Sequence, residues 1–172
     1  MINYFLKTQR LGLSIWNEND LNKALSLWGN PNVTKFITTT GSMSHDEVQQ
    51  RLNKEIDTYK DYKVQYWPVY LLETNEFIGC CGLRPYNLDD NIYEIGIHLK
   101  EEFWGQGFAK EICTEVIRYA FDELKVSALF AGHNPNNLKS PKLLKSIGFT
   151  YTHDEYYEPT GLNHPSYILK NK

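Results

Sequence analysis

The stretch Trp104-Gly105-Gln106-Gly107-Phe108-Ala109 lies between a strand-like run and the start of a long amphipathic run. Two glycines let the backbone turn tightly and bring its N–H groups close to a ligand. The first turn of the following helix adds unpaired N–H donors and the positive end of the helix dipole. Such a turn suits an anion such as a pyrophosphate. The same pattern also occurs in strand-to-helix turns that bind nothing, so Gly-x-Gly alone does not decide between the two.

The residues on either side of this turn predict a strand, a helix and a second strand. Ile92 to Leu99 reads as a strand, and apolar residues after the turn recur at helical spacing over about four turns, as far as Leu124. Val126 to Ala131 then suits a short strand. The turn lacks the Gly-Lys-Ser/Thr ending of a Walker A loop and the third glycine of the Rossmann fingerprint. Nucleotide binding of those two types is therefore a poor explanation.

The remaining segments complete the predicted fold. Strand-like runs occupy Arg10–Trp16, Val64–Leu72, Phe77–Leu83, Phe149–Tyr157 and Ser166–Leu169. Helices are predicted over Glu18–Trp28, from the capping-box residue Ser44 to about Tyr59, and from an N-cap at Ser140 to Gly148. Together these elements predict an α+β fold, with one domain over residues 1–172 and a mixed, mostly antiparallel sheet of about seven strands flanked by helices.

Composition and charge exclude several classes of function. The 18 Lys and Arg residues against 21 Asp and Glu residues give a net charge of −3, which argues against a nucleic-acid-binding surface. No apolar run approaches the ~20 residues that a membrane span needs, and Met1–Lys7 is too short for a signal peptide. The three cysteines do not suit a disulfide framework, and no Cys or His spacing suggests a metal. We expect a cytoplasmic protein without a metal or a membrane partner.

The glycine turn also resembles the cofactor signature of the GCN5-related N-acetyltransferase (GNAT) superfamily, Gln/Arg-x-x-Gly-x-Gly/Ala, except at Trp104. A tryptophan at that place resembles the branch that acetylates the N-termini of ribosomal proteins. Four further segments resemble this branch in the right order and extend the likeness over nearly the whole chain. They are Thr8-Gln9-Arg10-Leu11, Glu94-Ile95-Gly96-Ile97, Asn137-Leu138-Lys139-Ser140 and Lys145-Ser146-Ile147-Gly148-Phe149.

The resemblance implies acetyl-CoA as the acyl donor, with no metal, and a sheet whose fourth and fifth strands splay apart. The pantetheine arm would lie in the gap and pair with main-chain groups of Ile97 and Leu99. The pyrophosphate would lie on main-chain N–H groups of Gly105, Gln106, Gly107, Phe108 and Ala109. Trp104 replaces the usual Gln or Arg, so it either contacts the cofactor or simply packs between loop and sheet.

The resemblance assigns Asn137, Ser140 and Lys145 to the cofactor as well. Asn137 is equally well explained as a turn residue, and Ser140, which would lie near the cofactor sulfur, as the N-cap before Pro141. Many relatives carry a tyrosine four residues after this serine, thought to protonate the leaving thiolate, and this chain has Leu144 there. The general acid would then be water, Ser140 or another hydroxyl. The tyrosines considered are Tyr151, Tyr156, Tyr157 and Tyr167.

The amine must lose a proton to attack a thioester, because an α-amino group has a pKa of about 8. Glu94 is the first candidate for the general base, and a solvated strand carboxylate or a salt-bridge partner is the alternative reading. His98 is the second candidate, against a cleft-lining histidine. Strand alternation puts Glu94, Gly96 and His98 on one face, unless a bulge intervenes. A main-chain N–H near Ile97 or His98 would stabilise the oxyanion.

Three functions remain open. The first is acetylation of a protein N-terminal α-amine, and the second is acetylation of a small-molecule amine such as a polyamine, amino acid or drug. The third is a catalytically silent acyl-CoA-binding module, which would bind the cofactor without transfer. The sequence also leaves the oligomeric state open, with a homodimer as one option.

Overall fold

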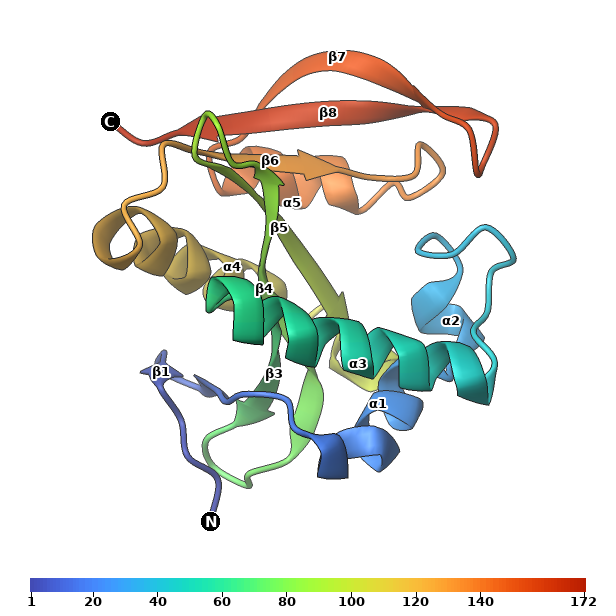
Figure 1. Ribbon diagram of the computed structural model, residues 1–172, viewed down its shortest axis with the longest axis vertical. Helices are drawn as coiled ribbons and strands as arrows, with labels where there is room; N and C mark the ends of the chain where they lie inside the picture. Colours follow the sequence, from blue (N-terminus) through green and yellow to red (C-terminus); the bar gives the residue numbers. More distant parts are fainter.

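A computed structural model describes all residues, 1–172, and shows one eight-stranded sheet with helices on both faces (Figure 1). The strand order is β1-β2-β3-β4-β5-β6-β8-β7. Neighbouring strands are antiparallel except for β5 and β6, which are parallel. The strands are β1 (Leu6–Lys7), β2 (Leu11–Leu13), β3 (Tyr66–Leu71), β4 (Phe77–Asn87), β5 (Ile92–Leu99), β6 (Ala128–Gly132), β7 (Thr150–Tyr157) and β8 (Leu162–Lys170). The helices are α1 (Leu21–Trp28), α2 (Pro31–Thr34), α3 (His45–Tyr62), α4 (Phe108–Arg118) and α5 (Ser140–Ser146). The predicted α+β fold and mostly antiparallel sheet are confirmed.

Two apolar cores lie on opposite faces of the sheet. Alternation along β4 sends Cys80 toward α1 and α3, and its neighbour Cys81 toward α4. The core on the α1–α3 side includes Trp28 and Leu52, and the larger core includes Ile112 of α4. Both faces of β4 are therefore covered, which explains why its first seven residues are all buried. All three cysteines are free and buried.

The N-terminal elements differ in detail from the prediction. The strand expected over Arg10–Trp16 is the short β2, and a further strand, β1, pairs with it, so the sheet has eight strands rather than seven. The expected helix over Glu18–Trp28 begins as a 3₁₀ turn, η1 (Glu18–Asp20), before α1. Gly29-Asn30-Pro31 ends α1, and Asn30 also caps a further helix, α2, by accepting a hydrogen bond from the Asn32 N–H at 2.9 Å. One helix stop thus serves as the next helix start.

The sequence predicts the start of α3 correctly but places the end of α4 too late. The capping box at α3 is confirmed, because the Glu47 N–H donates to Ser44 Oγ at 3.2 Å and the Ser44 N–H donates to the Glu47 carboxylate at 3.1 Å. The helix after the glycine turn is α-helical only to Arg118 and continues as a π-helical turn, η3 (Tyr119–Glu123). The strands β4 and β8 run several residues longer than predicted. Pairing with neighbouring strands, rather than local pattern, sets those ends.

The predicted splay lies between β5 and β6, the fourth and fifth strands if β1 and β2 are counted as one. Their pairing covers only Ile92–Glu94 of β5 against Ala128–Phe130 of β6. Beyond Glu94 the two strands diverge in Figure 1, where β5 descends toward α1 while β6 stays beside β8. A sheet that opens in this way leaves main-chain groups of both strands without strand partners.

Candidate active site

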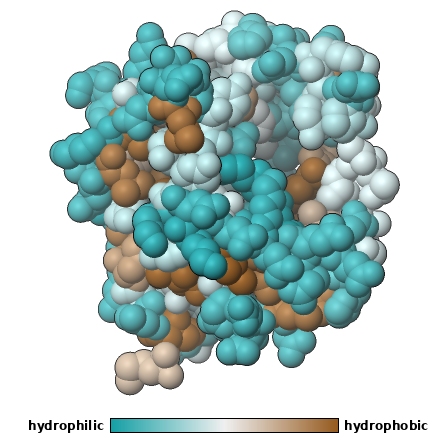
Figure 2. Space-filling model, in the orientation of Figure 1, coloured by the Kyte–Doolittle hydropathy of each residue, from teal (hydrophilic) through white to brown (hydrophobic).

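A cavity of about 590 Å³ occupies the wedge where β5 and β6 separate. One wall comes from α3, β3, β4 and β5, and the other from β6, α5, β7 and β8. Phe36 and Ile37, just after α2, close one end. Figure 2 shows a hollow on this face, with hydrophobic atoms exposed inside it. The cavity brings Glu94, Ile97, His98, Asn137 and Ser140 of the predicted site residues together.

The main chain of β5 is free on the side that faces the cavity. The Lys100 N–H donates to the Ile78 carbonyl at 2.8 Å, and the β4–β5 register is regular from there back to Tyr93. In an antiparallel pair only every second residue bonds to the partner strand. The main-chain groups of Ile97 and Leu99 therefore point away from β4, toward the gap. An extended amide-containing chain could bond to them as a neighbouring strand would.

The glycine turn presents unpaired N–H groups at the start of α4. Gly107 is the N-cap and has φ +80°, a left-handed conformation that side chains rarely adopt. No side chain caps the helix, and the first helical hydrogen bond runs from Glu111 N–H to the Gly107 carbonyl. The N–H groups of Phe108, Ala109 and Lys110 are thus left at the positive end of α4. They fit an anionic group such as a pyrophosphate.

Arg10 holds this turn from the N-terminal strands. Its Nη1 donates to the Gln106 carbonyl at 3.2 Å, and its guanidinium lies 4.3 Å from the centre of the Phe108 ring. Its Nε donates to the Glu111 carboxylate at 2.7 Å. The hydroxyl of Thr8 donates to the same carboxylate at 2.6 Å, which holds the pKa of Glu111 below its ordinary value. Sequence reasoning missed this role, and the likeness over Thr8-Gln9-Arg10-Leu11 was the one signal for it.

Trp104 joins the glycine turn to the end of β5. Its indole N–H donates to the Leu99 carbonyl at 2.9 Å, and the Lys139 ammonium lies 4.5 Å from its ring centre. The side chain is 38% exposed, so it is not a core residue. The indole N–H therefore occupies one acceptor position of the Leu99 carbonyl. The cation–π contact with Lys139 connects the glycine turn to the segment before α5.

The predicted site residues in and before α5 differ from the prediction in their positions. Lys139, not Ser140, is the N-cap of α5, and Ser140 caps nothing, so the N-cap reading of Ser140 is wrong. Its hydroxyl makes no hydrogen bond to the protein and lines the cavity beside Asn137, whose N–H closes a turn onto the Asn134 carbonyl at 2.9 Å. Leu144 is buried, and Lys145 is exposed outside the cavity lining.

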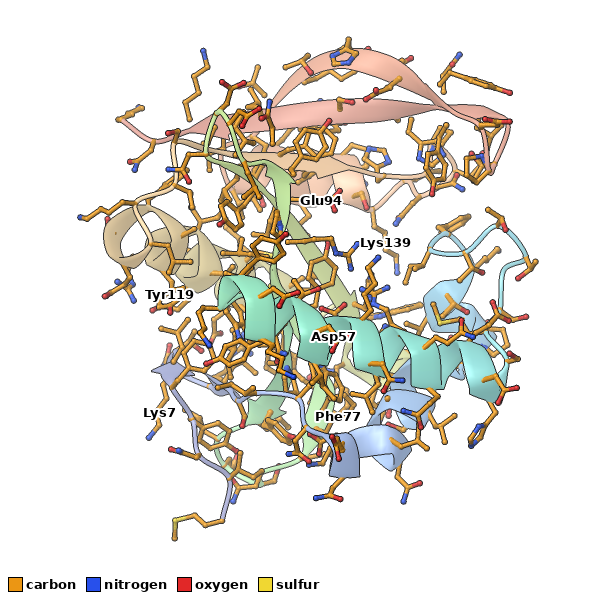
Figure 3. All side chains as sticks on the ribbon, viewed as in Figure 1. Lys7, Asp57, Phe77, Glu94, Tyr119 and Lys139 are labelled. Atoms are coloured by element: carbon orange, nitrogen blue, oxygen red, sulfur yellow. The ribbon has the colours of Figure 1, made fainter.

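Glu94 extends from β5 into the cavity (Figure 3). Its carboxylate accepts a hydrogen bond from the Tyr66 hydroxyl at 3.4 Å and lies 4.0 Å from Arg84 Nη1. Burial raises the pKa of Glu94 above its ordinary value, although Arg84 and the Tyr66 hydrogen bond oppose the rise. The strand irregularity falls at Pro85–Asn87 and leaves Glu94 directly opposite Arg84. Glu94 is a partly buried carboxylate at the point where the strands part.

His98 lies on the same face but has no free lone pair. The Trp28 indole N–H donates to its Nδ1 at 3.0 Å, and an indole nitrogen can only donate. The neutral ring then carries its own proton on Nε2. Burial and the charges of Arg51 and Arg84 lower the pKa of His98 well below its ordinary value. Of the two candidate bases, this geometry favours Glu94.

Glycine at position 96 lets Tyr66 lie over the strand between these two residues. A Cβ at Gly96 would collide with the Tyr66 ring. Tyr66 was not among the tyrosines that the sequence suggested as general acids. Two that were, Tyr156 and Tyr157 of β7, line the cavity. Tyr151 donates to Asp154 and Tyr167 lies beside His133, and neither lines it.

Comparison with known proteins identifies the family. The acetyltransferase (GNAT) domain family matches residues 10–150. The uncharacterised N-acetyltransferase p20 of Bacillus licheniformis is 30% identical over 144 residues, covering 84% of this chain and 81% of p20. The fold matches spermidine N-acetyltransferase from Vibrio cholerae, solved with CoA and spermine, with a TM-score of 0.79, 21% identity, and 95% and 97% of the two chains covered.

A second fold match is the ribosomal-protein-S5-alanine acetyltransferase from Vibrio fischeri, with a TM-score of 0.77, 17% identity and 96% of each chain covered. No helix of the chain is both long and apolar enough to cross a membrane, and no cluster of side chains could hold a metal ion. The wedge, the glycine turn and the family match agree. The chain belongs to the GNAT family of N-acetyltransferases, enzymes that take their acetyl group from acetyl-CoA.

Proposed function

We propose that this enzyme transfers the acetyl group of acetyl-CoA to a protein N-terminal α-amine in the wedge between β5 and β6. The observation that carries the proposal is the partly buried carboxylate of Glu94 in that cavity, next to the open edge of β5. When bound, acetyl-CoA supplies a thioester carbonyl for the amine to attack. The chain itself must hold the donor, take up a proton and exclude competing water.

Three parts of the chain would hold the donor. The main-chain groups of Ile97 and Leu99 face the gap and would pair with the pantetheine arm, with one acceptor position of Leu99 shared with Trp104. The N–H groups that follow Gly107 would bind the pyrophosphate. The free hydroxyl of Ser140 and the amide of Asn137 lie on the opposite wall, where they would form hydrogen bonds with acetyl-CoA.

Glu94 would act as the general base for the attacking amine. Burial raises the pKa of Glu94, so its carboxylate is a stronger base than that of an ordinary glutamate. Because Tyr66 and Arg84 both contact the carboxylate, its orientation is fixed. Because Leu144 is apolar, the leaving thiolate would be protonated by water or by a hydroxyl of the lining, that of Ser140, Tyr156 or Tyr157.

The acceptor wall supports a peptide more than a polyamine. Two arginines, Arg51 and Arg84, line the cavity, and cations of the acceptor would be repelled there. Exposed Tyr156 and Tyr157 of β7 lie on the outer wall, where a peptide could continue out of the cavity. A small amine that carries no further positive charge remains the second candidate for the same reason.

The test is an acceptor panel with purified enzyme and acetyl-CoA, read by thiol release and by the mass of the acceptor. The panel contains a lysine-containing peptide with a free N-terminus, the same peptide with a blocked N-terminus, and spermidine. We expect transfer to the free N-terminus and little to the other two. Preferred acetylation of spermidine or of the lysine side chain would contradict the proposed acceptor.

A further inference from the structure

Two partly buried arginines lie at the inner end of the cavity. Arg51 comes from α3 and Arg84 from β4, and their side chains are 12% and 24% exposed. The Tyr66 ring lies beside both guanidinium groups, with its centre 5.3 Å from Arg51 and 4.6 Å from Arg84. Arg51 also lies 4.9 Å from the centre of the Trp28 ring. Both guanidinium groups are thus held in place by aromatic neighbours.

The protein satisfies only a small part of their hydrogen-bonding capacity. Arg51 Nε and Arg84 Nη2 donate to the same oxygen of Glu55, at 2.7 and 3.3 Å. The other oxygen of Glu55 accepts the Tyr66 main-chain N–H at 2.9 Å. Arg51 Nη2 and Arg84 Nε are buried without any partner. A guanidinium carries five N–H donors, so most donors of the pair are not used within the fold.

The charges around the pair are not balanced either. One buried carboxylate, Glu55, contacts both arginines, and burial together with the two arginine charges lowers the pKa of nearby Lys54. Glu94 lies 4.0 Å from Arg84, but it would lose its charge when it takes the proton of the amine. The remaining carboxylate of the lining, Glu155, belongs to β7 on the opposite wall. During transfer the two arginine charges are therefore opposed by one carboxylate, that of Glu55.

We propose that Arg51 and Arg84 bind a carboxylate of the acceptor, so that the acceptor is a primary amine with a carboxylate a few bonds from its nitrogen. The short distance between Arg84 and Glu94 requires this closeness, since the amine must reach Glu94 while the carboxylate meets the guanidinium groups. The carboxylate has two sources: the side chain of an acidic first residue of a peptide, or the α-carboxylate of a free amino acid. The inference rests on the proposed role of the Glu94 cavity in acetyl transfer.

Matched acceptor pairs test the inference and separate the two sources. One pair is an amidated tripeptide that begins with aspartate and its counterpart that begins with asparagine. The other pair is serine and serinamide. We expect kcat/KM to be about 10- to 100-fold higher for the carboxylate member of one pair, the size of a charge-assisted hydrogen bond. A preference in the tripeptide pair identifies an acidic N-terminal residue, whereas a preference in the serine pair identifies a free amino acid and so favours the small amine given above as the second candidate.

Variants then connect the preference to the arginines. Arg84→Gln is expected to bring the ratio of kcat/KM within the preferred pair close to one, and Arg84→Lys to keep part of it, since lysine retains the charge without the fork. Arg118→Gln, an exposed arginine on α4 outside the cavity, is the control and keeps the wild-type ratio. Unchanged binding of acetyl-CoA shows that each variant is folded.

The outcomes separate this inference from the proposed function. Equal kcat/KM within both pairs in the wild type, or a ratio that survives Arg84→Gln, would overturn the carboxylate site while leaving transfer to an amine intact. Transfer to no acceptor, with acetyl-CoA still bound, would overturn the proposed function and this inference together.

Discussion

Glu94 is the residue on which the proposed chemistry depends. It lies where β5 leaves β6, opposite Arg84, and its carboxylate touches Tyr66. His98, four residues along the same face, is bonded to Trp28 through Nδ1. Glu94 therefore keeps a proton acceptor in the cavity, whereas the acceptor nitrogen of His98 is occupied by Trp28.

Replacing Glu94 by glutamine should reduce kcat by about 10²–10⁴-fold, the usual contribution of a general base. The amide is isosteric but takes up no proton. The binding of acetyl-CoA should not change, and calorimetry on the variant checks that the fold and donor site remain. A fall in kcat of less than about tenfold would rule out Glu94 as the base.

The Tyr66 hydroxyl should shift the pH dependence through Glu94. Its hydrogen bond lowers the pKa of the carboxylate, so Tyr66→Phe removes a lowering influence and the pKa rises further. Below that pKa, log(kcat/KM) falls more steeply with decreasing pH, because both the amine and Glu94 must be unprotonated. We expect the break in slope at higher pH in Tyr66→Phe than in the wild type. A break that moves to lower pH, or stays in place, would contradict the assignment.

At the scale of elements, the start of α4 is fixed from outside the helix. Gly107 allows the left-handed turn, and Arg10 holds it through the Gln106 carbonyl, the Phe108 ring and Glu111. The sequence predicted the turn and the helix from the glycines and the apolar spacing. It did not predict the Arg10 contacts, because residues about a hundred positions apart share no local pattern.

A double-mutant cycle on Arg10 and Glu111 tests this anchor. Arg10→Gln and Glu111→Gln should each weaken acetyl-CoA binding by a few-fold, and each should lower the free energy of unfolding by about 1–2 kcal/mol. The double variant should lose less than the sum of the two single losses, because both side chains share the Arg10–Glu111 contact. Additive losses in acetyl-CoA affinity would show that Arg10 does not act through Glu111.

At the scale of the whole molecule, the candidate active site lies where the pairing of β5 and β6 ends. Pairing of β5 and β6 over three residues joins the two parts of the sheet (Figure 1). Beyond that pairing the two strands diverge, and the cavity lies between them. The order of strands and helices could be predicted from the sequence, since each segment carries its own periodicity. Other features could not be predicted, because they depend on pairing partners and backbone angles. These are the ends of β4 and β8, the additional elements β1 and α2, and the N-cap at Lys139.

The candidate site was predictable to a similar degree. Five of the predicted site residues line one cavity: Glu94, Ile97, His98, Asn137 and Ser140. The cavity lining does not include Leu99, Trp104, Lys145 or the turn residues 105–109. The two arginines were not predicted, because neither Arg51 nor Arg84 stands in a recognisable motif. Their meeting follows from α3 packing across β3 and β4, which no single segment specifies.

Calorimetric titration with acetyl-CoA tests the central claim most directly, using the wild type, Gly107→Glu and Gly41→Glu. Both glycines have φ +80°, so both substitutions strain the backbone alike, but only Gly107 lies at the start of α4. We predict that the wild type and Gly41→Glu bind equally, while Gly107→Glu binds about 100-fold more weakly or worse, as expected from lost N–H contacts and added repulsion. No binding by the wild type, or equal binding by Gly107→Glu, would contradict the account.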